Sequence, residues 1–226
     1  MTWGLIGACL AAFALELSVT ASGGDAALEG FFSQWGAVPA DITRAFERGD
    51  YLGQATLGMV TSMFLHAGWL HLLGNMLFLW IFGNNVEDRL GPILYLLFYL
   101  VGGIAAAVTQ VVIDPNSGVP LVGASGAIAA ALGAYIVLFP GARILSLVFL
   151  GFFYQLLEVP ALILLGFWFG LQLLSGFAAL GAETAQGGVA FFAHIGGFAF
   201  GLAVGLLLRV VGAGGSRGRP ADGSMG

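Results

Sequence analysis

The scarcity of charged side chains is the feature that most restricts how this chain can fold. Only 8% of its residues are charged, whereas 59% are hydrophobic. Soluble domains carry about 25% charged residues, so we predict an integral membrane protein. A helix needs about 20 apolar residues to cross the bilayer core, and charged or turn-forming residues mark off six candidate spans. They cover residues 3–17 with a few beyond, part of 57–83, 92–113, 123–139, 160–177 and 190–208.

These spans predict an all-α membrane protein, a bundle of six transmembrane helices within residues 1–209. Residues 22–50 hold seven charged side chains and are predicted to form a long polar-aromatic loop with short helices. Residues 144–157 are apolar but short for a span, which favours a surface-lying or re-entrant segment. The glycine-rich stretch 210–226 is predicted to be a disordered cytoplasmic tail.

The arginines predict the orientation of the bundle, because cytoplasmic loops carry an excess of positive charge. Five of the seven follow even-numbered spans or lie in the tail, and only Arg44 and Arg48 follow an odd-numbered one. Both termini are therefore predicted to be cytoplasmic, and spans two, four and six to begin at the outer face. The apolar N-terminus is interpreted as a retained span, and the absence of targeting segments favours a prokaryotic plasma membrane, with an organellar membrane as the alternative.

Composition also bears on the partners of the chain. A net charge of −5 without any basic cluster argues against a nucleic-acid partner. The single cysteine, Cys9, cannot form an internal disulfide. The lipid bilayer is the one partner that composition predicts directly, and nothing in the sequence indicates an oligomeric state.

Five polar residues interrupt the even-numbered spans, and all three histidines of the chain are among them. An ionisable group inside a membrane is costly, so it marks a functional site by default. For each residue taken alone, an interhelical hydrogen bond or a tight helix crossing explains it equally well. Five together favour a shared site, and they are His66, His71, Asn75, Ser125 and His194.

Spacing suggests how such a site forms. Ser125 begins a ridge of small residues that continues through Ala129 and Gly133, and glycines at 197 and 201 follow His194 in the same manner. Ridges of small residues let two helices approach backbone to backbone. If these two pack together, the Ser125 hydroxyl meets the His194 imidazole near the outer surface. A hydroxyl beside a base is the arrangement that nucleophilic catalysis requires.

Donors for a developing oxyanion also come from this set. His71 and Asn75 are four residues apart, so they share one face of span two. Ser125 stands at a predicted helix N-terminus, where free N–H groups favour negative charge. No acidic residue is placed to orient His194, which favours a Ser–His dyad over a triad.

Three motifs together resemble the rhomboid intramembrane serine proteases. They are HAGWLHLLGNMLFLWIFGNNVEDRLG (66–91), GASGA (123–127) and AHIGGFAFG (193–201). The resemblance covers residues 3–208 and implies the six-helix rhomboid fold. It implies that Ser125 is the nucleophile and His194 the general base and acid, with His71 and Asn75 in the oxyanion hole. The structural or packing residues that it implies are His66, Gly123, Gly126, Gly197, Gly201 and the pair Glu87 and Arg89 at the cytoplasmic end of span two.

The chain departs from the family pattern at two places. Many members carry an aromatic residue four positions after the serine, on which the imidazole stacks, whereas this chain has Ala129. Phe191, Phe192 or Phe198 are the alternatives predicted to hold the ring. The stretch 22–50 also shows no clear match to a Trp–Arg pair found in some members.

The activity implied by the resemblance is hydrolysis of single-span membrane proteins near the outer membrane face, without a cofactor or metal. Three histidines could in principle bind zinc, but no HExxH motif or carboxylate ligand accompanies them. Two other functions stay open. A non-catalytic rhomboid-like protein would bind membrane helices, and a small-solute transporter would show an internal repeat with broken helices. The intact serine and histidine argue against the first, and the lack of a repeat argues against the second.

Overall fold

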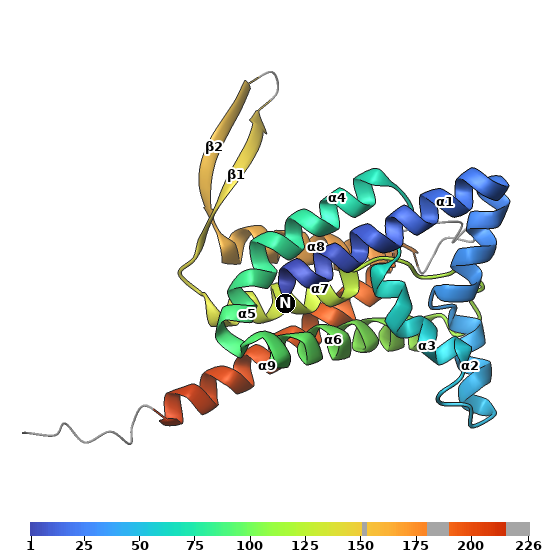
Figure 1. Cartoon of the computed structure of the whole chain (residues 1–226). Helices are drawn as coiled ribbons and strands as arrows, with labels where there is room; N and C mark the ends of the chain where they lie inside the picture. The colour runs from blue at the N-terminus through green and yellow to red at the C-terminus, as the bar shows by residue number, and fades with distance from the viewer. Residues whose placement is uncertain (151–152, 180–189, 216–226) are drawn as a thin grey trace, which may run out of the picture.

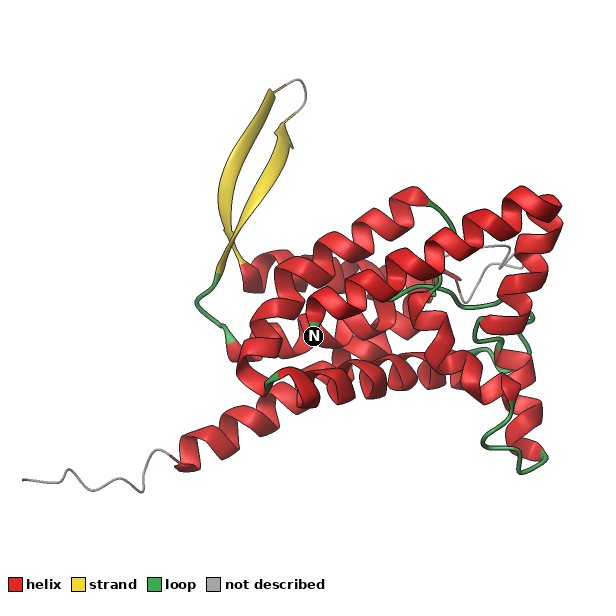
Figure 2. Ribbon diagram, viewed as in Figure 1, coloured by secondary structure: helices red, strands yellow, loops and turns green. Residues whose placement is uncertain are grey.

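A computed structural model describes residues 1–150, 153–179 and 190–215 of the chain, with side chains for 1–148, 153–178 and 190–211. The described part is a bundle of helices from which one β-hairpin projects (Figures 1 and 2). The elements are α1 (Thr2–Trp35), α2 (Pro39–Glu47), α3 (Gln54–Thr61), a 3-10 turn (Ser62–Phe64), α4 (Trp69–Phe78), a π-helical turn (Leu79–Gly83), α5 (Asn84–Leu90), α6 (Pro92–Ile113), α7 (Ser125–Leu138), β1 (Arg143–Leu150), β2 (Phe153–Pro160), α8 (Ala161–Ala179) and α9 (Phe191–Gly215).

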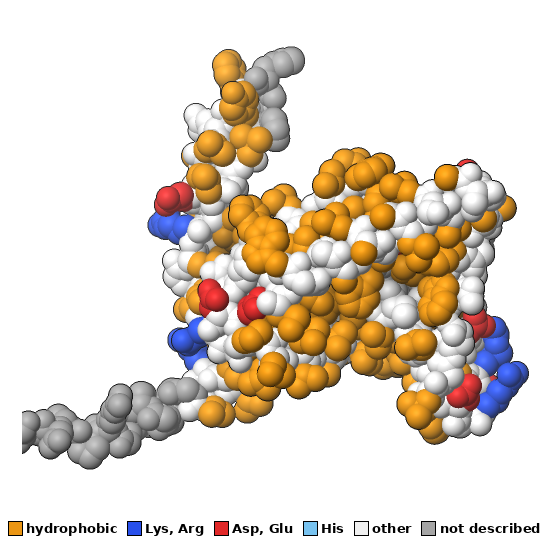
Figure 3. Space-filling view, viewed as in Figure 1, with side chains coloured by type: hydrophobic (Ala, Val, Ile, Leu, Met, Phe, Trp, Pro, Cys, Tyr) orange, Lys and Arg blue, Asp and Glu red, His pale blue; other side chains and the backbone are white. Residues whose placement is uncertain are grey.

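The helices confirm the predicted helical membrane fold. Among the described residues, α1, α6, α8 and α9 are each long and apolar enough to cross a bilayer, and the bent pair of Gln54–Phe64 with Trp69–Leu90 adds a fifth candidate. Helix α7 is shorter, with 14 residues, and nearly all of it is buried. Apolar side chains cover the middle of the bundle while charged ones gather at its two ends, as a membrane-spanning orientation requires (Figure 3).

Helix α7 lies at the centre because its residues are small. Its alanines and Gly133 leave room for α9, whose glycines sit against its backbone. A Cβ atom added at Gly201 would run into the carbonyl oxygen of Ala130, and one at Gly197 would run into that of Gly126. The two ridges of small residues predicted from the sequence therefore face each other in the structure.

Span two, predicted within 57–83, is broken near its N-terminal end rather than continuous. The segments on either side of the break meet at 79°. His66 lies in this break, and its backbone N–H donates to Oε1 of Glu16 on α1 at 3.0 Å. That carboxylate supplies the partner that a continuous helix would otherwise have provided.

The segment 22–50, predicted to be a loop with short helices, is mostly helical. Helix α1 continues to Trp35, with a break at Gly24, where φ is 69° and ψ is −164°. Glycine adopts this conformation at little cost, so the chain turns there without ending the helical run. Helix α2 then begins at Pro39, and proline is favoured in the first turn of a helix.

Residues 143–150 and 153–160 pair as a β-hairpin, an element that the all-α prediction did not include; whether this segment lies on the membrane surface or re-enters the membrane stays a prediction. Strands β1 and β2 pair antiparallel, with Arg143 opposite Pro160 and Leu147 opposite Leu156. The hairpin leaves the bundle between α7 and α8 (Figures 1 and 2). Helix α9 extends to Gly215, so residues 210–215, predicted to belong to a disordered tail, are helical. Residues 216–226 of the predicted tail lie outside the described residues.

Candidate active site

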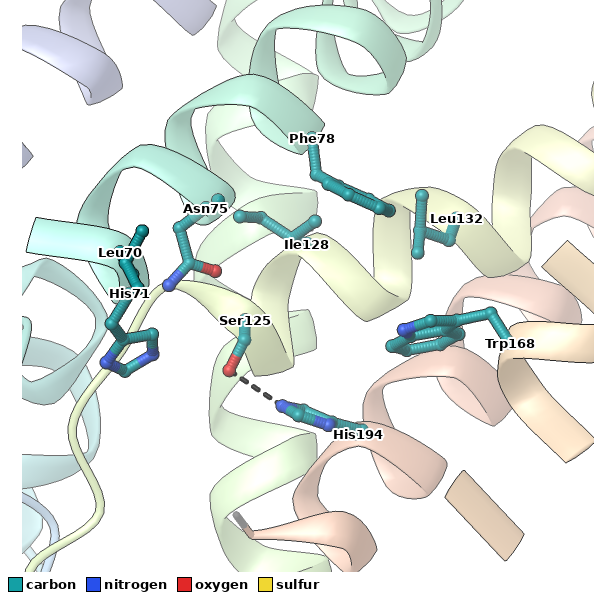
Figure 4. Close-up of a pocket in the computed structure, with 10 residues that line it drawn as sticks. Leu70, His71, Asn75, Phe78, Ser125, Ile128, Leu132, Trp168 and His194 are labelled. Carbon is teal, nitrogen blue, oxygen red and sulfur yellow. Dashed lines mark hydrogen bonds between the residues drawn. The ribbon is translucent and has the colours of Figure 1, made fainter. Parts of the chain in front are cut away.

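Ser125 and His194 meet at the same end of two packed helices. Ser125 is the first residue of α7, and His194 lies in the first turn of α9. The Oγ atom of Ser125 is 2.7 Å from Nε2 of His194, a hydrogen bond that Figure 4 marks. The imidazole is 8% exposed. The close approach of the two helices through Gly197 and Gly126 brings these side chains into contact.

Helix α8 supplies two further contacts to the imidazole, and the sequence reasoning missed both. Oε1 of Gln172 lies 2.9 Å from Nδ1 of His194. The Trp168 ring lies against the imidazole, with centroids 5.8 Å apart and planes at 37°. Gln172 stands out as an amide within an apolar span, and the rule that marks polar residues in spans would have found it.

The aromatic neighbour of His194 differs from the three phenylalanines predicted. Trp168 occupies that place, and Phe198 packs against Trp168 at a centroid distance of 6.3 Å. Phe191 and Phe192 instead face Gly176 of α8, where an added Cβ would lie 3.4 Å from each of them. The aromatic contact to the ring of His194 therefore comes from α8.

His71 and Asn75 lie across Ser125 from His194 and line the same cavity, which has a volume of about 210 Å³ (Figure 4). Nδ1 of His71 is 3.4 Å from the backbone N–H of Ala67 and can accept from it, which leaves the proton of a neutral ring on Nε2. Nδ2 of Asn75 is buried and has no hydrogen-bond partner in the described part of the chain. Each of the two side chains therefore has an N–H group near the serine that is available to donate a hydrogen bond.

Gly123 fixes the approach of the chain to Ser125. Its N–H donates to the carbonyl oxygen of Ser62 at 2.9 Å, and its φ is 132°. A Cβ at this position would lie 2.7 Å from Nε2 of His71. Gly126, on the other side of Ser125, faces α6, where an added Cβ would lie 2.7 Å from that of Ala106.

Three of the residues predicted to be structural, His66, Glu87 and Arg89, are not glycines, and they too lie outside the lining of the cavity. The ring of His66 is edge-on to that of His71, with centroids 5.3 Å apart, so His66 borders the site without lining it. Glu87, on α5, accepts the backbone N–H of Thr2 at 2.7 Å. No ion pair joins Glu87 to Arg89 within the residues that the structure covers.

At the centre of the cavity a serine hydroxyl is hydrogen-bonded to an imidazole. In residues 1–150, 153–179 and 190–215, no three His, Cys, Asp or Glu side chains come together as metal ligands would. The side-chain donors and acceptors that line it include a hydroxyl, two imidazoles and one amide, and a second amide, that of Gln172, contacts His194. Phe78, Leu132 and Trp168 form the apolar part of the wall.

Comparison with known proteins gives one family. The model of the Rhomboid domain matches residues 54–210. Rhomboid protein 1, mitochondrial, of Saccharomyces cerevisiae is 30% identical over 160 residues, which are 69% of this chain and 42% of the relative. Rhomboid-like protein 11, chloroplastic, of Arabidopsis thaliana is 44% identical over 69 residues, 30% of this chain and 24% of the relative. Rhomboid protease GluP of Bacillus subtilis is 42% identical over 76 residues, 34% of this chain and 14% of the relative.

The matches to these relatives span less than half the length of each. Two of them are named as mitochondrial and chloroplastic, and the third comes from a bacterium. The predicted prokaryotic plasma membrane therefore gains no support from them.

Proposed function

The chain belongs to the rhomboid family, and from this premise we propose that it is an intramembrane serine endopeptidase that cleaves single-span membrane proteins near the outer membrane face. One observation carries the proposal. The hydroxyl of Ser125 is hydrogen-bonded to Nε2 of a buried histidine, at 2.7 Å, inside a cavity of a membrane protein. A serine hydroxyl is a weak nucleophile until such a base accepts its proton.

The reaction follows from the positions of these groups. Oγ of Ser125 attacks the scissile carbonyl carbon while Nε2 of His194 takes the hydroxyl proton, and the imidazolium then protonates the leaving amine. The N–H groups of His71 and Asn75 stabilise the oxyanion, together with the backbone N–H of Ser125 in the first turn of α7. Water then attacks the acyl-enzyme ester, with His194 again acting as the base, and releases the second product.

The direct test uses the purified protein in liposomes with a model single-span substrate. Mass spectrometry identifies the fragments, and a fluorophosphonate probe reports whether Ser125 is a reactive serine. We expect one main cut and covalent labelling at Ser125. Substrate binding without cleavage or labelling would instead support the helix-binding function, which retains the fold but not the chemistry.

Substituting Gly123 with alanine is expected to lower kcat by up to about 10²-fold, because displacement of a catalytic group by 1 Å can cost that much. The new Cβ would press on Nε2 of His71, and alanine would be strained at a φ of 132°. Initial cleavage rates in liposomes measure the effect. The matched control is Gly118→Ala in the same connection, where an added Cβ meets nothing within 4 Å. Equal cleavage rates for the Gly123→Ala and Gly118→Ala variants would contradict the proposed role of His71 in the oxyanion hole.

A further inference from the structure

Gln172 forms the only hydrogen bond to Nδ1 of His194 within the described residues, at 2.9 Å from its Oε1. An amide oxygen can only accept, so this contact requires the proton of the ring to be on Nδ1. A neutral imidazole protonated at Nδ1 has its lone pair on Nε2. That atom faces the hydroxyl of Ser125 at 2.7 Å, as catalysis by a base requires.

We propose that Gln172 is a positioning residue of the proposed protease: its amide oxygen holds His194 in the tautomer and orientation that let Nε2 take the proton of Ser125. The inference rests on the proposed function and deepens it. Gln172 is not among the residues that line the cavity, and its side chain bonds His194 and not Ser125, so it acts through His194. A buried acceptor at Nδ1 has this role in other sites with a nucleophile and a histidine, where it is a carboxylate or an amide.

The geometry of α8 supports the assignment. Trp168 and Gln172 are four residues apart, so both project from the same face of the helix. The Trp168 ring lies against the imidazole, at a centroid distance of 5.8 Å, and Oε1 of Gln172 accepts a hydrogen bond from Nδ1 on its edge. One turn further on, Gly176 lets α8 approach the start of α9 closely. Helix α8 thus restrains both the tilt and the rotation of the ring.

The choice of an amide fits the depth of the site. A carboxylate inside a membrane protein is costly to bury because it loses its hydration. An amide supplies the same acceptor oxygen without a charge. The amide of Gln172 therefore takes the place of the acidic residue that orients the histidine in a Ser–His–Asp triad. It adds an orienting group to the Ser–His pair.

The kinetic test replaces Gln172 with methionine, which has a similar shape but cannot bond Nδ1. The group that orients a functional histidine in metal sites contributes about 10- to 100-fold to activity, and we expect a comparable loss in kcat here with little change in KM. Gln172→Glu keeps an oxygen at the same reach and is expected to recover most of the rate. The matched control is Gln155→Met on exposed strand β2, which is expected to cleave like the wild type.

A spectroscopic arm tests the same contact without any substrate. The chain has three histidines, so a ¹⁵N-histidine spectrum of the protein is simple, and His194→Asn identifies the signals of His194. We expect the Nδ1–H tautomer in the wild type and a larger Nε2–H population in Gln172→Met. A dominant Nε2–H tautomer in the wild type, or an unchanged kcat in Gln172→Met, would overturn the assignment. A wild type that does not cleave contradicts the proposed protease, and the spectrum then decides the role of Gln172 by itself.

Discussion

Replacement of Ser125 by alanine is expected to reduce substrate cleavage below detection, because loss of a serine nucleophile alone costs about 10⁶-fold in kcat in a soluble serine protease. No other hydroxyl in the described part of the chain bonds His194, so none can take over. His194→Ala is expected to have an effect of the same size, since the two side chains act as one unit. Fragment yield from the single-span substrate, measured in liposomes, provides the comparison.

The loss of cleavage in Ser125→Ala has to be distinguished from a loss of folded protein. Ser125→Ala removes one hydrogen bond from His194 and leaves its bond to Gln172, so we expect the unfolding free energy to change by only about 1 kcal/mol. Ser175→Ala, on α8 outside the cavity, is a matched control that should cleave normally. Wild-type cleavage by the Ser125→Ala protein would mean that another protease, or another nucleophile, is responsible.

The sequence predicted the meeting of Ser125 and His194 because each lies on a ridge of small residues, and such ridges depend on local periodicity. Once both segments are helical, two ridges of small residues can pack against each other in only a few ways. Gln172 could not be placed in the same way. Its bond to His194 depends on how α8 is rotated against α9, and that rotation follows from contacts such as Gly176 against Phe191.

Two of the differences between the predicted and the observed fold have distinct physical origins. The break before α4 is stabilised by a bond between Glu16 and the N–H of His66, fifty residues apart, which no window along the chain can detect. The hairpin at 143–160 comes from a short apolar run, whose pattern does not distinguish a buried helix from a strand. In the first case a tertiary contact overrides local preference, and in the second the local preference is itself ambiguous.

Substitution of Gly201 by valine is expected to produce the largest loss of stability, because a Cβ there would overlap the carbonyl oxygen of Ala130 on α7. Neither backbone can give way without separating the two central helices, and overpacking of this kind typically costs roughly 1–3 kcal/mol, occasionally more. We expect the cost at Gly201 to exceed that range because the clash is with backbone. Thermal unfolding in detergent, followed by tryptophan fluorescence, measures the change.

The matched control is Gly166→Val on α8, an exposed position where an added Cβ meets nothing within 4 Å. Since His194 lies seven residues before Gly201 on α9, splaying the helices also draws Nε2 away from Ser125. Cleavage by the Gly201→Val protein should therefore fall further than its folded fraction. If both valine variants unfolded at the same temperature, close contact between α7 and α9 would not be what brings the serine to its base.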